Sequence, residues 1–150
     1  MYLEPEQLIE VVRLTPLVSI DMIVRDAQDR VLLGQRLNRP AQNTWFVPGG
    51  RILKDERLDQ ALERISSSEL GRTLQRDRFH FLGVYEHLYP DNFLGRDGVG
   101  THYVVLAHEI VLTEPALPEP DGQHRRFRWW SIRELREDSS VHDNTKAYFV

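Results

Sequence analysis

The stretch Gly50-Arg51-Ile52-Leu53-Lys54-Asp55-Glu56, followed seven residues later by Arg64-Ile65-Ser66-Ser67-Ser68-Glu69-Leu70-Gly71, is the most informative part of this sequence. Leu58, Leu62, Ile65 and Glu69 fall on one helical face, because seven residues make nearly two turns. A carboxylate therefore continues an apolar stripe near the helix C-terminus, where the helix dipole disfavours anions. A divalent cation would compensate the charge. A solvated glutamate in a frayed last turn is the alternative, and this feature alone favours it.

Working outward from this segment, the pattern predicts one domain that spans residues 1–150, because no repeat, low-complexity tract or linker interrupts it. Gly71 stands where a helix C-cap glycine belongs. Helices are also predicted at Pro5 to Arg13 and Ile132 to Glu137, and strands at Leu17 to Arg25, Arg30 to Arg36, Phe79 to Tyr89, Thr101 to Leu112 and Arg126 to Ser131. Many strands and few helices favour an α+β domain over an alternating α/β domain.

Composition excludes several classes of protein. The chain contains no cysteine, which excludes disulfides, thiolate chemistry and cysteine-based zinc sites, and which suits the reducing cytoplasm. Its apolar runs are short and broken by charges, so we expect neither a signal peptide nor a membrane span. A net charge of −4 argues against nucleic-acid binding. Only Lys54 and Lys146 of the 19 basic residues are lysine, a bias that we attribute to codon usage.

The spacing of the opening segment resembles the signature of the Nudix hydrolase family, G-x5-E-x7-R-E-U-x-E-E-x-G-U. Residues Gly50, Glu56, Arg64, Glu69 and Gly71 stand at the family positions. The resemblance implies a mixed β-sheet sandwiched between helices, with the Gly50 carbonyl and Glu69 as ligands of a divalent metal. It also implies that Glu56 and Arg64 tie a loop to the helix. Without such a role, Glu56 would be an acidic residue in the first turn of the helix, and Arg64 would be one partner of an ordinary surface ion pair.

The departures from this signature concern the chemistry. Ile65 and Ser68 stand where the family has glutamates, and Arg72 replaces a bulky apolar residue. In typical members those glutamates gather several metal ions and activate the water that attacks phosphorus. Glu69 alone gives poor support to such an attack, so either the protein is inactive or its chemistry has moved elsewhere.

Within this family the chain is similar, nearly from end to end, to the branch that hydrolyses GDP-mannose. The similarity is carried by the stretches TPLVSID, LLGQR, NRPAQNTWFVPGGR, ERLDQALERISSSELG, YEHLYPDNF, THYVVL, QHRRFRW and VHDNTKAYF. It implies Mg²⁺-dependent release of GDP and free mannose by water attack at the anomeric carbon with inversion, with GDP-glucose as another possible substrate. Mn²⁺ can substitute for Mg²⁺. It also implies a homodimer, for which Met1 to Arg13 is our candidate interface.

The same resemblance assigns roles around the reacting bond. His124 matches the general base, and an ordinary histidine pKa near neutrality suits that task. Arg36 and Arg51 match the arginines that stabilise the leaving group. Gln123 matches a third metal ligand beside Gly50 and Glu69, and a neutral amide oxygen suits a hard cation. From the sequence alone, His124 is equally a surface histidine, and both arginines are equally solvated strand ends.

Three further residues have weaker assignments. The resemblance implies that Asp21 and His87 lie near the sugar and that Tyr103 lies near the leaving phosphates. Tyr103 is equally a core aromatic, and Asp21 an exposed strand residue. Tyr89 is interpreted as a loop aromatic rather than a guanine-stacking residue.

Two rival functions remain open at this point. One is a nucleotide-sugar pyrophosphatase that yields GMP and mannose 1-phosphate. The other is a non-catalytic domain that senses a nucleotide sugar. The sequence does not fix the preferred sugar or base.

Overall fold

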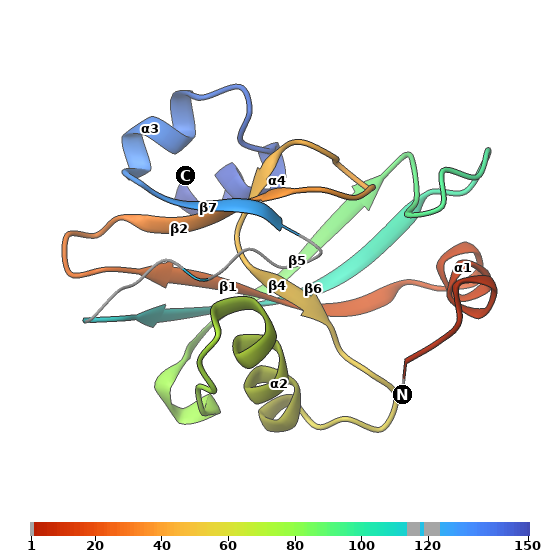
Figure 1. The fold of residues 1–150 in the computed structure, drawn as a ribbon, viewed down its shortest axis with the longest axis horizontal. Coiled ribbons are helices and arrows are strands. Elements are labelled where there is room, and N and C mark those ends of the chain that lie inside the picture. Colours follow the sequence, from red (N-terminus) through yellow and green to blue (C-terminus); the bar gives the residue numbers. More distant parts are fainter. Residues whose placement is uncertain (1, 114–117, 119–123) are drawn as a thin grey trace.

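The computed structural model describes residues 2–113, 118 and 124–150, and in it a mixed β-sheet lies between helices (Figure 1). The strands are β1 (Leu17–Arg25), β2 (Val31–Arg36), β3 (Trp45–Phe46), β4 (Gly49–Arg51), β5 (His80–Tyr89), β6 (Thr101–Val111) and β7 (His124–Trp130). The α-helices are α1 (Pro5–Leu14), α2 (Leu58–Leu70), α3 (Ile132–Glu137) and α4 (Asp143–Lys146), with short 3₁₀ turns η1 (Arg76–Arg78) and η2 (Ala147–Phe149). This architecture confirms the predicted fold class.

The sheet contains a fork: β1 and β2 pair at Arg25 and Val31 and separate from there on, and this separation shapes the site. Its strand order is β3-β2-β1-β6-β5, and β1 runs parallel to β6 over nine paired residues. By contrast, β1 pairs with β2 only at Arg25 and Val31. Beyond that point the short strand β4 pairs with β1, while β7 pairs with β2. The Gly49-Gly50 turn is therefore held against the middle of β1.

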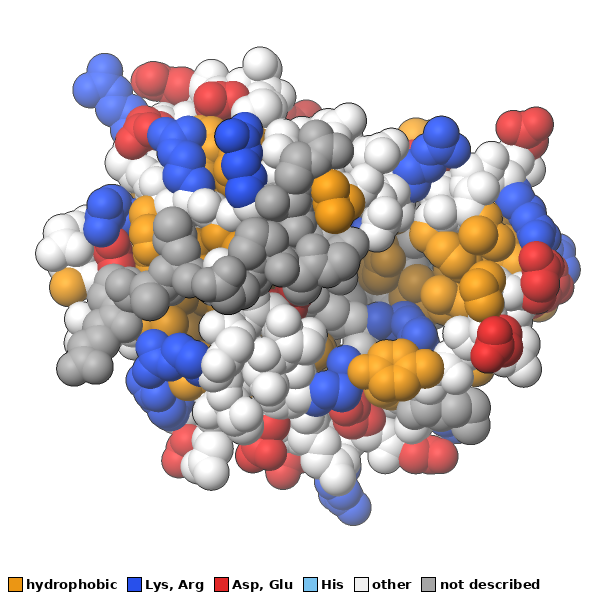
Figure 2. Space-filling view, in the orientation of Figure 1, with side chains coloured by type: hydrophobic (Ala, Val, Ile, Leu, Met, Phe, Trp, Pro, Cys, Tyr) orange, Lys and Arg blue, Asp and Glu red, His pale blue; other side chains and the backbone are white. Residues whose placement is uncertain are grey.

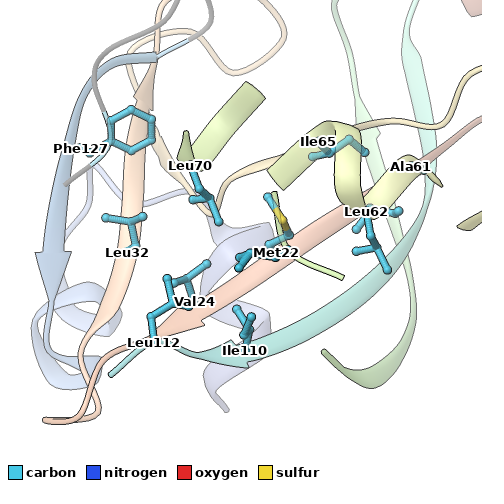
Figure 3. Packing of buried hydrophobic residues seen from close by; sticks show 12 residues of the cluster. Met22, Val24, Leu32, Ala61, Leu62, Ile65, Leu70, Ile110, Leu112 and Phe127 are labelled. Atoms are coloured by element: carbon cyan, nitrogen blue, oxygen red, sulfur yellow. The ribbon is translucent and has the colours of Figure 1, made fainter. Parts of the chain in front are cut away.

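Two apolar layers hold the sheet between its helices. In β1, Met22 and Val24 point toward α2 (Figure 3). Ile23 packs on the other face, with Leu135 of α3, because successive side chains alternate along a strand. Leu62 of α2 and Leu135 of α3 are fully buried, one in each layer. Burial of each such side chain contributes about 1.5–3 kcal/mol. Both faces of β1 are thus fixed.

Helix α2 ends at a left-handed glycine. Gly71 has φ 69°, and its backbone N–H donates to the Ser67 carbonyl. No atom lies within 4 Å of the position that a Cβ at Gly71 would take. Any cost of adding a side chain is therefore conformational rather than steric.

We expect Gly71→Ala to lower the free energy of unfolding by about 1 kcal/mol, because an L-residue is strained in the left-handed region. Urea unfolding measures this change. Gly71→Asn is the control, since asparagine tolerates this conformation and should cost less. Equal losses for the two variants would contradict the explanation.

Most elements predicted from the sequence are confirmed. The strand Leu17–Arg25 and the helix Ile132–Glu137 have the predicted bounds, and the Ser131 side chain caps that helix by accepting from the Glu134 N–H. Strand β4 and helix α4 were not predicted. No helix within the described residues is long and apolar enough to cross a membrane.

Candidate active site

An ion pair fixes the loop between β4 and α2. The Arg64 guanidinium donates to both carboxylate oxygens of Glu56, at 2.7 and 2.9 Å, and to the carbonyl of Arg51 at 2.8 Å. Glu56 also accepts the backbone N–H of Leu53. The Arg64 guanidinium holds the pKa of Glu56 below its usual value. The two side chains therefore join the loop to the helix, through charge-assisted bonds that are stronger than neutral ones.

Glu69 is buried beneath the glycine turn. Its side chain is 3% exposed, and one carboxylate oxygen accepts the backbone N–H of Gly49 at 3.1 Å. A solvated glutamate in a frayed turn is thus excluded. Ile65, one turn earlier, packs so closely on Gly50 that a Cβ there would lie 3.2 Å from its Cγ1. Ser68 is exposed. Position 65 therefore belongs to the core, and position 68 faces away from it.

The donors at this turn suit a hard divalent cation. The Glu69 carboxylate lies beside β4, whose residue Gly50 supplies a backbone carbonyl, and oxygen donors are those that Mg²⁺ prefers. Within the described residues, no three histidine, aspartate or glutamate side chains gather into a metal site. Gln123, the third ligand that the resemblance implies, lies outside the described residues. Nudix hydrolases in general use divalent cations such as Mg²⁺.

A pocket of about 360 Å³ opens beside the glycine turn. In Figure 2 this face is hollowed, with basic side chains in the hollow and apolar ones along its wall. Six of the residues singled out from the sequence line the pocket: Asp21, Arg36, Gly50, Arg51, His87 and Tyr103. They come from five different strands, β1, β2, β4, β5 and β6, which the fork in the sheet brings together.

The environment of the Arg36 guanidinium suits the binding of an anion. It ends β2, and its guanidinium lies 5.7 Å from the centre of the Phe46 ring. Its Nε atom is buried and has no hydrogen-bond partner among the described residues. A buried donor without a partner is costly, and an acceptor that enters the pocket would remove that cost. Arg51, on β4, adds a second guanidinium to the same pocket.

Asp21 and His87 meet at one wall of the pocket through a tyrosine. The Tyr148 hydroxyl donates to Asp21 Oδ2 at 2.6 Å and lies 3.5 Å from His87 Nε2. Burial raises the pKa of Asp21 to about 7, although the Tyr148 bond opposes this shift. Burial lowers the pKa of His87 to about 4, helped by the nearby His142. The imidazole is therefore neutral at physiological pH. Asp21 lines the pocket and is not an exposed strand residue.

His124 begins β7, where its Cα is paired with that of Arg36. The backbone of the predicted base thus lies beside the pocket, on the strand next to a pocket arginine. The side chain of His124 lies outside the described part of the structure.

Three aromatic residues of the pocket, Phe46, Tyr89 and Phe93, were not predicted as site residues. Tyr89 ends β5, at the predicted end of that strand, and lines the pocket. Its ring centre lies 6.3 Å from that of Phe46 and 6.2 Å from that of Tyr103. Burial raises the pKa of the Tyr89 hydroxyl, so it stays protonated. Tyr103 lines the pocket and packs on the buried residues Ile9 and Val12, while its place near the leaving phosphates stays a prediction.

Comparisons with known proteins agree on a family. The family model described as "NUDIX domain" matches residues 15–149. The low-salt glycan biosynthesis protein Agl8 of Haloferax volcanii is 40% identical over 114 residues, which cover 75% of this chain and 69% of Agl8. A MutT NUDIX hydrolase from Burkholderia pseudomallei superposes with a TM-score of 0.69 at 25% identity, covering 89% of this chain and 95% of that one. A MutT protein from Methanosarcina mazei gives 0.70 at 16% identity, covering 89% and 91%.

Proposed function

This chain belongs to the NUDIX domain family, and we propose on that premise that it hydrolyses GDP-mannose, or a related GDP-hexose such as GDP-glucose, to GDP and the free sugar. The glycan-related name of the relative Agl8 supports a sugar-bearing substrate. The pocket volume of about 360 Å³ falls within the range of small-molecule sites. We further propose that the protein is a cytoplasmic homodimer, for which residues 1–13 are the candidate interface.

The observation that carries this proposal is the arrangement of charge in the pocket. Arg36 and Arg51 line it together, and the buried Arg36 Nε has no partner among the described residues. On the same lining, Asp21 and His87 offer oxygen and nitrogen acceptors. A nucleoside-diphosphate sugar has matching parts, namely an anionic diphosphate for the arginines and hydroxyl groups for the acceptors.

We assign the chemistry to the sugar carbon. Water attacks C1, the bond from C1 to the diphosphate oxygen breaks, and the bonding electron pair leaves with GDP. Arg36 and Arg51 stabilise the charge that develops on that oxygen. His124 accepts the proton from the attacking water. A divalent cation held by the Gly50 carbonyl, Glu69 and Gln123 would supply further positive charge to the leaving diphosphate.

The core supports attack at carbon rather than at phosphorus. Ile65 is 1% exposed and packs on Gly50, so it occupies the place of one glutamate that activates water in typical family members. The exposed Ser68 supplies no carboxylate at the other place. In the proposed site, His124 replaces these acids as the group that activates water.

The test is which bond breaks. In ¹⁸O-labelled water, we expect the label on mannose and none on GDP. A single displacement inverts C1, so α-linked GDP-mannose should first give β-mannose, which NMR detects before mutarotation. Label on phosphate, or GMP with mannose 1-phosphate as products, would instead support the rival activity of a nucleotide-sugar pyrophosphatase. Absence of turnover with bound substrate would indicate a sensor domain.

A further inference from the structure

Tyr148 connects the C-terminal segment to the two acceptors in the pocket wall. It lies in η2, and its hydroxyl reaches Asp21 on β1 and His87 on β5. Its ring packs edge-on against Tyr85, with 4.7 Å between ring centres. Asp21 and His87 line the pocket, and Tyr148 is not among the lining residues. Tyr148 therefore lies outside the pocket lining and contacts the two side chains, Asp21 and His87, that line it.

One hydrogen bond of this hydroxyl has a fixed direction. Burial raises the pKa of Tyr148, so the phenol stays protonated, and its O–H donates a hydrogen bond to Asp21 Oδ2 at 2.6 Å. The phenol oxygen then has only lone pairs left, which would accept from His87 Nε2, 3.5 Å away, if that nitrogen carries the imidazole proton. A neutral imidazole that carries its proton on Nε2 has Nδ1 as an acceptor. Asp21 likewise keeps Oδ1, which lies against the Gly49 turn.

We propose that Tyr148 is a positioning residue that sets the pair of acceptors, Asp21 Oδ1 and His87 Nδ1, with which the pocket recognises the hydroxyl groups of the sugar. This inference rests on the proposed function, because it takes the sugar to lie at this wall. Without the hydroxyl, Asp21 loses its donor, and the His87 ring is free to take the other tautomer.

The matched variants are Tyr148→Phe and Tyr85→Phe. Each removes one hydroxyl from the same edge-on ring pair and keeps both rings. The Tyr85 hydroxyl has no hydrogen bond to Asp21 or His87, so Tyr85→Phe reports on the loss of a hydroxyl from this cluster as such.

For GDP-mannose we expect Tyr148→Phe to lower kcat/KM about 10–100-fold, because Asp21 and His87 both lose the group that orients them. The preference for GDP-mannose over GDP-glucose should shrink with it. Affinity for GDP, which lacks the mannosyl group, should stay within about 2-fold by calorimetry. Tyr85→Phe should leave all three values unchanged. In an Asp21→Ala background, which has no side-chain acceptor at this position, Tyr148→Phe should add little, because the two changes remove the same contact.

Equal losses of GDP and GDP-mannose affinity in Tyr148→Phe would show a structural role and overturn the proposal, as would unchanged sugar discrimination. If the wild type binds GDP-mannose and releases no GDP, the proposed function fails while the affinity comparison still tests Tyr148. If Tyr148→Phe does not fold, ¹⁵N NMR of the His87 ring in the wild type decides. Protonated Nε2 at neutral pH supports the inference, and protonated Nδ1 contradicts it.

Discussion

Replacing His124 by glutamine should lower kcat for GDP-mannose hydrolysis by about 10²–10⁴, while KM stays within a few-fold. The reason is that His124 is the proposed base, whereas the substrate is held mainly through its diphosphate. The backbone of His124 pairs with that of Arg36, the residue that we propose stabilises the leaving group. Activity of the wild type should rise with pH as the imidazole loses its proton, and then level off.

His80→Gln is the matched control for this variant. His80 begins β5, is exposed, and is absent from the pocket lining. The same side-chain change there should leave kcat and the pH profile as they are. A His124→Gln enzyme with normal kcat would remove His124 from the mechanism, and a rising pH profile that persists in the variant would assign the titration to another group.

Local patterns were sufficient to predict most of the fold. The strand Leu17–Arg25 and the helix that ends at Gly71 are determined by residues within a few turns of one another, so periodicity and capping identify them. The resemblance to the Nudix signature likewise implies that Glu56 and Arg64 tie the loop to the helix, through an ion pair. The structure contains that pair.

Long-range contacts were beyond such patterns. Tyr148 lies 127 residues after Asp21, and no spacing rule connects them. Strand β4 has only three residues, two of them glycine, and glycine weakens any strand pattern. It is a strand because the fork leaves an edge of β1 open to it. A Cβ at Gly49 would lie 2.4 Å from the Ile20 carbonyl, so this close pairing requires glycine.

The position of Glu69 depends both on a local sequence pattern and on long-range contacts. Sequence periodicity places a carboxylate on the apolar stripe of α2, and the structure buries it to 3% exposure. A buried carboxylate is costly unless it is compensated. The backbone N–H of Gly49 donates to this carboxylate. Asp21 lies near enough that the charge of Glu69 raises the pKa of Asp21. A divalent cation between these carboxylates and the glycines would therefore be stabilising.

From this balance we expect Glu69→Gln to lower kcat/KM by about 10²–10³ and to weaken Mg²⁺ binding at least about 10-fold. The amide keeps an oxygen acceptor for Gly49 and removes the charge, so the metal-free variant should keep or raise its Tm. Added Mg²⁺ should raise the Tm of the wild type more than that of the variant, because only a bound ligand stabilises the fold. Glu63→Gln, six residues earlier in α2, makes the same charge change as a control. Equal Mg²⁺ dependence of activity in the wild type and Glu69→Gln would mean that the metal binds elsewhere.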